Sequence, residues 1–160
     1  MEKAATSHLT GHCLCGEVSY ELKASPMVVH CCHCTHCQQM SGSAFALNAT
    51  IEAEKIEVTS GSVVSSDAQV KDGSLHRVYR CKSCWSPLWS AYNGRPLRSL
   101  RLGSLDQPDF FQPDFHIFVR SKLEWVVIPE GAKQFQAFYK IEEEWPEDSL
   151  LRLKLALGQK

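Results

Sequence analysis

The sequence lacks the long apolar runs and the charge imbalance that would indicate a membrane or a nucleic acid as partner. Its apolar runs fall far short of the roughly 20 residues that a membrane-spanning helix needs, and the opening MEKAATSHLTGH lacks the apolar core of a signal peptide. The 17 Lys and Arg residues are balanced by 18 Asp and Glu residues, so we expect no basic face for DNA, RNA or anionic lipid. These absences predict a cytoplasmic protein with neither a nucleic-acid nor a membrane partner.

Internal repeats, low-complexity tracts and convincing linkers are also missing. A chain of 160 residues without them is most simply one domain, and it is long enough to bury a hydrophobic core without disulfides. Eight cysteines therefore need another explanation. They occur in tight groups rather than scattered along the chain, which favours metal binding over a disulfide framework in a cytoplasmic protein. The cysteines are Cys13, Cys15, Cys31, Cys32, Cys34, Cys37, Cys81 and Cys84.

The dominant hydrophobic rhythm has a period of two, which is typical of β-strands. It predicts a mainly β protein of several short antiparallel sheets. Helix is expected only just after Cys37, in QQMSG, and in the C-terminal PEDSLLRLKLALGQK, where alternating leucines also permit a strand. We expect a zinc-binding domain at 10–140 and a C-terminal appendage at 141–160. The expected strands lie in GEVSYEL, MVVHC, KIEVTSG, HRVYRC, PLWSAY, SLRLGSL, HIFV and EWVVI.

Two pairs of cysteines have the spacing of a structural zinc site. A CxC pair near the start of the chain and a CxxC pair in its middle each bring two thiolates within reach of one ion. Together they supply the four sulfurs of a tetrahedral structural zinc, which would join the beginning of the domain to its middle. The four predicted ligands are Cys13, Cys15, Cys81 and Cys84.

The remaining cysteines suggest a second site with three ligands. If the strand MVVHC continues, alternation places Cys32 and Cys34 on one face and Cys31 and His33 on the other. Cys37 follows Cys34 at a CxxC spacing, so the chain can curl back onto the same ion. Three protein ligands with one open position are typical of a catalytic zinc.

A closed second site is the alternative. Cys31, His33 or His36 could supply a fourth ligand and make this site structural as well. His33 and His36 could instead exchange protons near pH 7, or could lie beside the zinc ligands or at the surface without binding the metal. The sequence leaves these alternatives open.

Four segments of the chain resemble one known family. GHCLCGEVSYEL, CHCTHCQQMSGSAF, YRCKSCWSPL and FHIFVRSKLEWV resemble, in order and spacing, the glutathione-dependent formaldehyde-activating enzymes, a family that includes centromere protein V. The resemblance covers roughly residues 10 to 135. It implies an Mss4-like β-fold with two zinc ions. The structural zinc maps to Cys13, Cys15, Cys81 and Cys84, and the catalytic zinc maps to Cys32, Cys34 and Cys37.

Two positions depart from the family pattern. Family members usually carry Arg directly after the third cysteine of the second cluster and Gly after the last cysteine of the CxxC pair. This chain has Gln38 and Trp85 there. Trp tolerates positive φ poorly, so we expect the turn at Trp85 to change. Gln38 removes a cation beside the expected active metal, which leaves the substrate open.

The chemistry of a zinc with three thiolate ligands favours binding a thiol. Zinc deprotonates a coordinating thiol, which would deliver a thiolate to a nearby carbonyl carbon at neutral pH. The resemblance implies a carbon-sulfur lyase or synthase similar to S-(hydroxymethyl)glutathione synthase, with a small-molecule thiol such as glutathione as substrate. No Arg or Lys stands out as a ligand for glutathione carboxylates, and the sequence does not indicate an oligomeric state.

The alternative function is a non-catalytic, zinc-stabilised protein-binding module, which the resemblance to centromere protein V also permits. A chromatin or microtubule partner would favour a basic tail, and the chain has none. The sequence therefore favours the enzyme.

Overall fold

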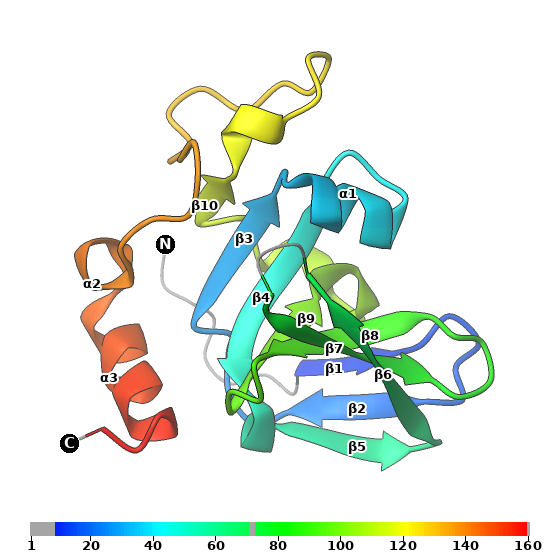
Figure 1. Cartoon of the computed structure of the whole chain (residues 1–160). Helices are drawn as coiled ribbons and strands as arrows, with labels where there is room; N and C mark the ends of the chain where they lie inside the picture. Colours follow the sequence, from blue (N-terminus) through cyan, green and yellow to red (C-terminus); the bar gives the residue numbers. More distant parts are fainter. Residues whose placement is uncertain (1–8, 71–72, 160) are drawn as a thin grey trace.

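A computed structural model describes residues 9–70 and 73–159 of the chain, and it is mainly β (Figure 1). This confirms the fold class expected from the period-two pattern. The strands are β1 (Leu9–His12), β2 (Ser19–Leu22), β3 (Val28–Cys32), β4 (Ala46–Glu52), β5 (Ile56–Ser60), β6 (Val63–Gln69), β7 (Leu75–Cys81), β8 (Pro87–Tyr92), β9 (Leu97–Arg101) and β10 (Phe115–Ile117). The helices are α1 (Thr35–Ser41), α2 (Ile141–Glu144) and α3 (Glu147–Ala156), with short 3₁₀ helices at Ala53–Lys55, Leu102–Ser104, Pro108–Phe110 and Val119–Ser121.

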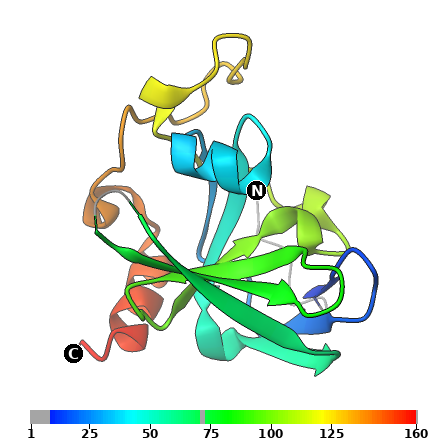
Figure 2. The same ribbon diagram turned by 45° about the vertical axis from the view of Figure 1, so that its right-hand side comes forward.

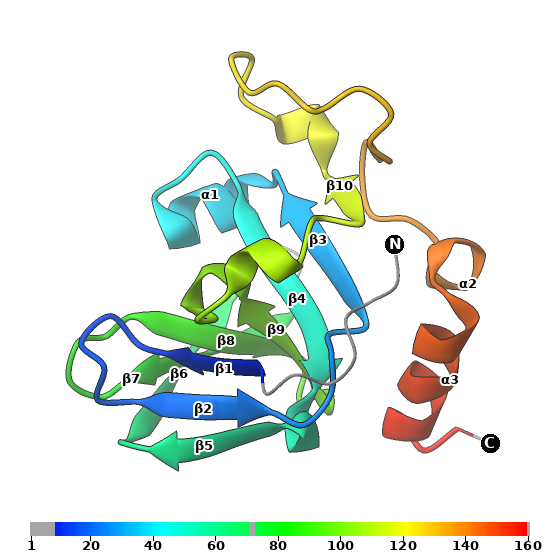
Figure 3. The same cartoon turned by 180° about the vertical axis from the view of Figure 1, so that it is seen from behind.

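The strands form two sheets. The smaller sheet has the order β1-β2-β5, and the larger has the order β10-β3-β4-β9-β8-β7-β6. Neighbouring strands are antiparallel except β10 and β3, which are parallel. Figure 3 shows the small sheet beside the large one, seen from behind.

The main hydrophobic core joins the small sheet to strands of the large sheet. Val18, Tyr20 and Leu22 are buried together, as their alternation predicted. The Tyr20 ring meets Trp89 of β8 edge to face, with centroids 5.5 Å apart. This contact joins the two sheets, because Tyr20 belongs to β2 and Trp89 to the large sheet.

The second cysteine cluster lies where β3 passes into α1. The strand ends at Cys32, two residues earlier than the continuous strand considered from the sequence, and Cys34 is the N-cap of α1. The helix therefore starts before Cys37 rather than after it. Its last turn ends at Gly42, whose φ of 66° suits glycine in the left-handed region.

One expected strand is absent. The segment EWVVI does not form a strand, and it follows the 3₁₀ helix Val119–Ser121 as a turn and loop. Its apolar side chains Trp125 and Val127 are largely exposed, so the alternation does not correspond to a buried face. The chain curls here around Lys122, whose ammonium group donates to the carbonyl oxygens of Leu123 and Val126.

The C-terminal segment forms helix, with α3 starting at Glu147, close to the expected position. The helix is fixed to the sheet: Ser149 Oγ donates to the carbonyl oxygen of Met27, and Arg152 pairs with Glu52 through hydrogen bonds of 2.8 and 2.6 Å. Figure 2 shows the β6-β7 hairpin reaching towards the side on which α2 and α3 lie. The boundary between a 10–140 domain and a 141–160 appendage stays a prediction.

The described helices include none that is long and apolar enough to cross a membrane.

Candidate metal centres and active site

The two distant cysteine pairs meet in space. The Sγ atoms of the four cysteines lie within 4.8 Å of one another, and the measured pairs include 3.5 Å from Cys13 to Cys15 and 3.9 Å from Cys15 to Cys81. A tetrahedral zinc with Zn–S bonds of about 2.3 Å places its sulfurs roughly 3.8 Å apart, so the cluster fits such an ion. The members are Cys13, Cys15, Cys81 and Cys84.

Backbone amides and a hydroxyl support this cluster. Val18 N donates to Cys13 Sγ at 3.2 Å, and Ser83 N donates to Cys81 Sγ at 3.4 Å. The pKa of Cys84 is lowered to about 5, first by the side-chain hydrogen bond with Ser86. Donors around these sulfurs stabilise thiolates, which are the form that binds a metal.

Trp85 adopts the backbone conformation that glycine would favour. It follows Cys84 with φ of 60°, and its amide donates to the carbonyl oxygen of Cys81. The turn after the CxxC pair therefore has the left-handed form despite the bulky residue, contrary to the change of turn that the sequence suggested. Its indole is exposed, so nothing indicates that packing compensates the strain.

The second cluster contains three cysteines from β3 and α1. Cys32 ends the strand, Cys34 caps the helix and Cys37 lies in its first turn. Cys32 Sγ and Cys34 Sγ are 3.5 Å apart, and all three sulfurs lie within 4.8 Å of one another. The group has no fourth Cys, His, Asp or Glu among the described residues. These distances fit a zinc held by three thiolates, with one position left for another ligand.

Close packing couples the ionisation of these three thiols. The pKa of Cys34 is lowered, chiefly by hydrogen bonds from Cys32 and Cys37, while the same contact with Cys34 raises the pKa of Cys32. Cys37 N also donates to Cys34 Sγ at 3.3 Å. One of the three thiols can lose its proton readily, because the other two donate hydrogen bonds to the thiolate. Ionisation of all three needs a cation between them, because the negative charges repel one another.

Cys31 of β3 and His33, which directly follows the strand, lie apart from the three-cysteine cluster, as alternation predicted. With His116 of β10 they form a third group: Cys31 Sγ is 3.6 Å from His33 Nε2, which is 3.1 Å from His116 Nδ1. One sulfur and two nitrogens could hold a metal, but a zinc-bound histidine normally donates its second N–H to an acceptor. His33 Nδ1 is buried without a partner among the described residues. We therefore interpret the group as a hydrogen-bonded cluster, in which a protonated His33 Nε2 can donate to His116 Nδ1 with Cys31 Sγ beside it.

Gln38 holds the backbone and does not line the cavity beside the cluster. Its Nε2 donates to the carbonyl oxygens of His33 and Ser121, at 2.8 and 2.9 Å. The cation near the cluster comes instead from Arg101 of β9, whose Nη1 donates to Asn48 Oδ1. Asn48 Nδ2 in turn lies 3.9 Å from Cys37 Sγ.

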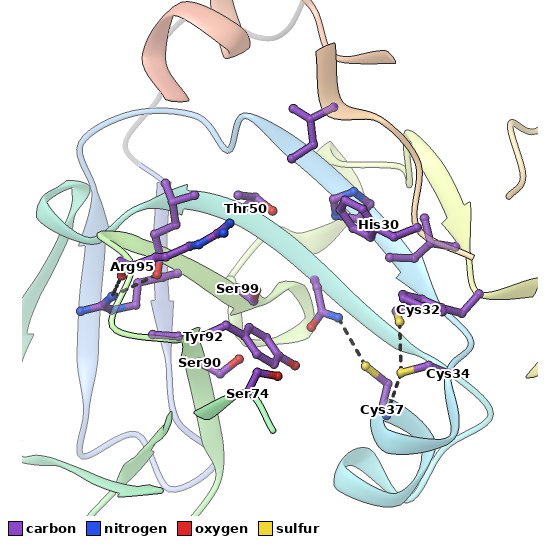
Figure 4. A pocket seen from close by; sticks show the side chains of 18 of the residues that line it. His30, Cys32, Cys34, Cys37, Thr50, Ser74, Ser90, Tyr92, Arg95 and Ser99 are labelled. Carbon is purple, nitrogen blue, oxygen red and sulfur yellow. Dashed lines mark hydrogen bonds between the residues drawn. The ribbon is translucent and has the colours of Figure 1, made fainter. Parts of the chain in front are cut away.

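A cavity of about 950 Å³ opens beside the three cysteines (Figure 4). Its floor is one face of the large sheet, where β-pairing sets side chains in rows. His30, Asn48 and Arg101 form one row across β3, β4 and β9. The next row carries hydroxyls, from Thr50, Ser99 and Ser90. Ser90 is 1% exposed, and its hydroxyl has no hydrogen-bond partner among the described residues.

The cavity lining is strongly cationic, although the chain as a whole is nearly neutral. It contains five Arg and Lys residues and a single carboxylate, that of Glu142. None of the four arginines is in an ion pair found among the described residues. Figure 4 shows Arg95 at the end of the cavity away from the cysteines. The cations are Arg95, Arg98, Arg101, Arg120 and Lys154.

His36 also lines the cavity, from the first turn of α1. Its Nε2 lies 3.0 Å from His76 Nδ1, and the His76 ring stacks on Tyr92 with centroids 4.4 Å apart. Burial lowers the pKa of His76 to about 4, so this ring is neutral near pH 7. A neutral His76 can fix the orientation of the His36 ring through their hydrogen bond.

The phenylalanines at 110, 111 and 115 do not line this cavity. Phe110 is exposed, Phe111 packs against the main core and Phe115 is buried in a second core cluster. The aromatic rings that line the cavity include those of Phe118 and Phe138. The arginines of the lining did not stand out in the sequence.

Comparison with known proteins gives three results. A Penicillium rubens protein named "Putative glutathione-dependent formaldehyde-activating enzyme" is 26% identical over 140 residues, which is 85% of this chain and 72% of that protein. A crystal structure of a Rhodobacter sphaeroides protein is similar with a TM-score of 0.47 and 20% identity, covering 65% of this chain and 96% of the other. The sequence model of the glutathione-dependent formaldehyde-activating enzymes matches residues 8–121, and the chain therefore belongs to this family.

Proposed function

We propose that the protein is a zinc-dependent carbon-sulfur lyase or synthase, which makes and cleaves adducts between a carboxylate-bearing thiol and a carbonyl compound. One observation carries the proposal: three clustered cysteines, with no fourth ligand among the described residues, line a cavity rich in unpaired arginines. Family membership supports the same chemistry. We further propose two zinc ions, one at each cysteine cluster, and a cytoplasmic location.

The three-cysteine cluster would hold one zinc, which when bound presents a coordinating thiol as a thiolate at neutral pH. The surrounding residues fix this cluster. Cys37 N donates to Cys34 Sγ. Asn48 Nδ2 lies 3.9 Å from Cys37 Sγ, and Asn48 Oδ1 accepts a hydrogen bond from Arg101. The ligand sulfurs are thereby held in place before a substrate arrives, which favours a defined open position.

The arginines would bind and orient the substrate. Glutathione carries two carboxylates, and arginine pairs with a carboxylate through two parallel N–H donors. Arg101 lies near the cysteines through its contact with Asn48, and Arg95 lies towards the far end of the cavity (Figure 4). We expect the two arginines to hold the two carboxylates of one extended thiol.

The reaction balances without an oxidant or a reductant. In synthesis the thiol sulfur adds to the carbonyl carbon, the C=O π electrons move to oxygen, and that oxygen takes up the proton that the thiol has lost. In cleavage the carbon-sulfur bond breaks and the same proton returns. His36 lines the cavity, so an imidazole is available for this exchange.

A turnover assay tests the proposal. The rate of S-hydroxymethylglutathione formation and exchange, followed by NMR above the uncatalysed rate, should be raised by the zinc-loaded protein. Cys34→Ser should abolish this acceleration while the protein stays folded, because the other cluster joins the strands. Cys31→Ser, on the opposite face of β3, is the matched control and should retain it. If no thiol and aldehyde pair is accelerated by the wild-type protein, the proposal is wrong and the alternative of a zinc-stabilised binding module gains support.

A further inference from the structure

We propose that the carbonyl partner in these adducts is larger than formaldehyde and carries an apolar chain, which lies against the C-terminal helices. The inference rests on the proposed function and names the substrate class of the same cavity. It is drawn from the size of the cavity, from the chemistry of its two sides and from the way the C-terminal helices are held.

The cavity is much larger than a one-carbon unit requires. Its volume of about 950 Å³ is near the upper end of the roughly 300–1,000 Å³ found for pockets that hold drug-sized ligands. In S-hydroxymethylglutathione, the part derived from the aldehyde is a single carbon with a hydroxyl group. Such a group reaches little beyond the sulfur, so space would remain after glutathione had bound.

The unused side of the cavity is mostly apolar, although Glu142, Lys154 and Gln159 of the same segment also line the cavity. Five side chains from α2, α3 and the residue that follows each helix line it, and we call them the C-terminal wall. The wall lies outside residues 8–121, the part that the family model matches. Its members are Ile141, Trp145, Leu150, Leu153 and Leu157.

The C-terminal wall is held by contacts of its own helices. On α3, the neighbouring Ser149 and Arg152 bind Met27 and Glu52, so the helix is fixed from outside the cavity. Trp145 Nε1 donates to the Tyr139 hydroxyl at 2.6 Å, and that hydroxyl lies 2.6 Å from His30 Nε2 on the cavity floor. An apolar surface held in place in this way is suited to binding, because little entropy is lost in ordering it.

A linear aldehyde would use both sides of the cavity. The thiol sulfur adds to the aldehyde carbon, the aldehyde oxygen becomes a hydroxyl by taking the thiol proton, and the alkyl chain extends along the C-terminal wall. Each methylene group that leaves water there should tighten binding about fourfold. The charged part of the thiol would stay with the arginines.

Non-reactive thioethers test this arrangement without any need for turnover. We expect S-hexylglutathione to bind the full-length, zinc-loaded protein at least about tenfold more tightly than S-methylglutathione, measured by isothermal titration calorimetry. Leu153→Asn should remove most of this preference, because it places a polar side chain in the C-terminal wall. Leu155→Asn is the matched control: Leu155 is exposed on the same helix and does not line the cavity, so the preference should remain.

Circular dichroism checks that each variant is folded, and Leu157→Asn replaces Leu153→Asn if the latter unfolds. Equal affinities of the two thioethers in the wild-type protein would overturn the inference, and so would an equal loss of preference in Leu153→Asn and Leu155→Asn. Turnover measurements show whether only the larger substrate is wrong or the proposed function is wrong as well. Acceleration of the formaldehyde reaction without a preference for S-hexylglutathione contradicts only the larger substrate. No acceleration with either formaldehyde or hexanal contradicts the proposed function, and the larger substrate with it.

Discussion

Asn48 and Arg101 face each other across β4 and β9, and the amide of Asn48 joins the guanidinium of Arg101 to the sulfur of Cys37. The pairing places a cation beside the three-cysteine cluster, although the two residues are 53 positions apart in the chain. Arg101 is also free of carboxylate partners in the ion pairs of the described residues. A carboxylate of the substrate can therefore pair with the Arg101 guanidinium.

Replacing Arg101 should weaken the binding of a carboxylate-bearing thiol. Arg101→Gln removes a charge-assisted hydrogen bond worth about 1.5–3 kcal/mol, so the KM for glutathione should rise roughly tenfold or more. The KM for 2-mercaptoethanol, which has no carboxylate, should change much less. Arg77→Gln is a suitable control, because Arg77 pairs with Asp67 and does not line the cavity. Equal effects of Arg101→Gln on both thiols would show that Arg101 acts through the cysteine cluster rather than on the substrate.

The two cysteine clusters should differ in their effect on stability. Cys81→Ser removes a ligand from the site that joins the two ends of the segment 13–84, and binding free energy at such a site is folding free energy. We expect the loss of one zinc equivalent and a reduction in unfolding free energy of several kcal/mol. Cys34→Ser should also lose one equivalent but keep a melting temperature much closer to that of the wild type. Plasma mass spectrometry and calorimetry measure both quantities, and an unchanged zinc content and melting temperature in Cys81→Ser would contradict the structural role.

Trp85 should be a source of strain. Trp85→Gly places glycine where φ is 60°, and relief of the backbone strain should raise the unfolding free energy. The greater conformational freedom of glycine in the unfolded chain offsets part of this effect, so we expect a net gain of at most about 1 kcal/mol. Trp125→Gly is the control, since Trp125 is also exposed but does not have positive φ. Urea unfolding of the zinc-loaded proteins measures the difference. A loss of stability in Trp85→Gly equal to that in Trp125→Gly would show that the Trp85 turn is unstrained.

The ion pair between Arg152 and Glu52 should make stability depend on pH. Burial alone would raise the pKa of Glu52, but hydrogen bonds from Arg152 outweigh it, and the pKa lies below the ordinary value of 4.5. A carboxyl with a lowered folded pKa stabilises the protein above its unfolded pKa, and this contribution is lost as the pH falls through the folded pKa. Arg152→Gln leaves a nearly buried carboxylate unpaired and should cost about 3 kcal/mol at pH 7.

Unfolding of Arg152→Gln and the wild type at several pH values measures this contribution. Burial raises the pKa of Glu52 once Arg152 is gone, so the deficit of the variant should begin to shrink as the pH falls through this raised pKa. It should disappear below the lowered pKa of the paired carboxyl, since protonated Glu52 no longer needs its partner. A deficit that stays constant between pH 7 and pH 3 would show that Arg152 stabilises α3 by packing and through its bond to the Ser25 carbonyl oxygen.

Local spacing was enough to predict which cysteines form pairs, but the meeting of Cys15 with Cys81, 66 positions away, depends on the whole fold. CxC and CxxC pairs bring their sulfurs together whatever the rest of the fold does, and alternation along β3 separated Cys31 from Cys32. The helical part of the second cluster was less predictable. Cys34 turned out to be the N-cap of α1, a role that Ser, Thr, Asp and Asn usually fill.

The cavity could not be predicted from the sequence because it depends on contacts between distant strands and helices. The register that places Asn48 beside Arg101 is set by the whole sheet, and the C-terminal wall depends on where α3 docks. For the segment EWVVI, the sequence predicted a strand that the structure does not contain. Its alternation has the period of a strand, but the described residues include no strand that pairs with it, and Trp125 and Val127 are largely exposed.

The most direct test of the proposal asks whether a thiol enters the three-cysteine site. Cobalt replaces zinc in the wild-type protein, in Cys34→Ser and in Cys31→Ala, and glutathione is added while the thiolate-to-cobalt absorption is followed. We predict that the band grows with one equivalent of glutathione in the wild type and in Cys31→Ala, whose substitution lies on the opposite face of β3, and that it does not grow in Cys34→Ser. A wild-type spectrum that glutathione leaves unchanged would show a closed site and would contradict the proposed function.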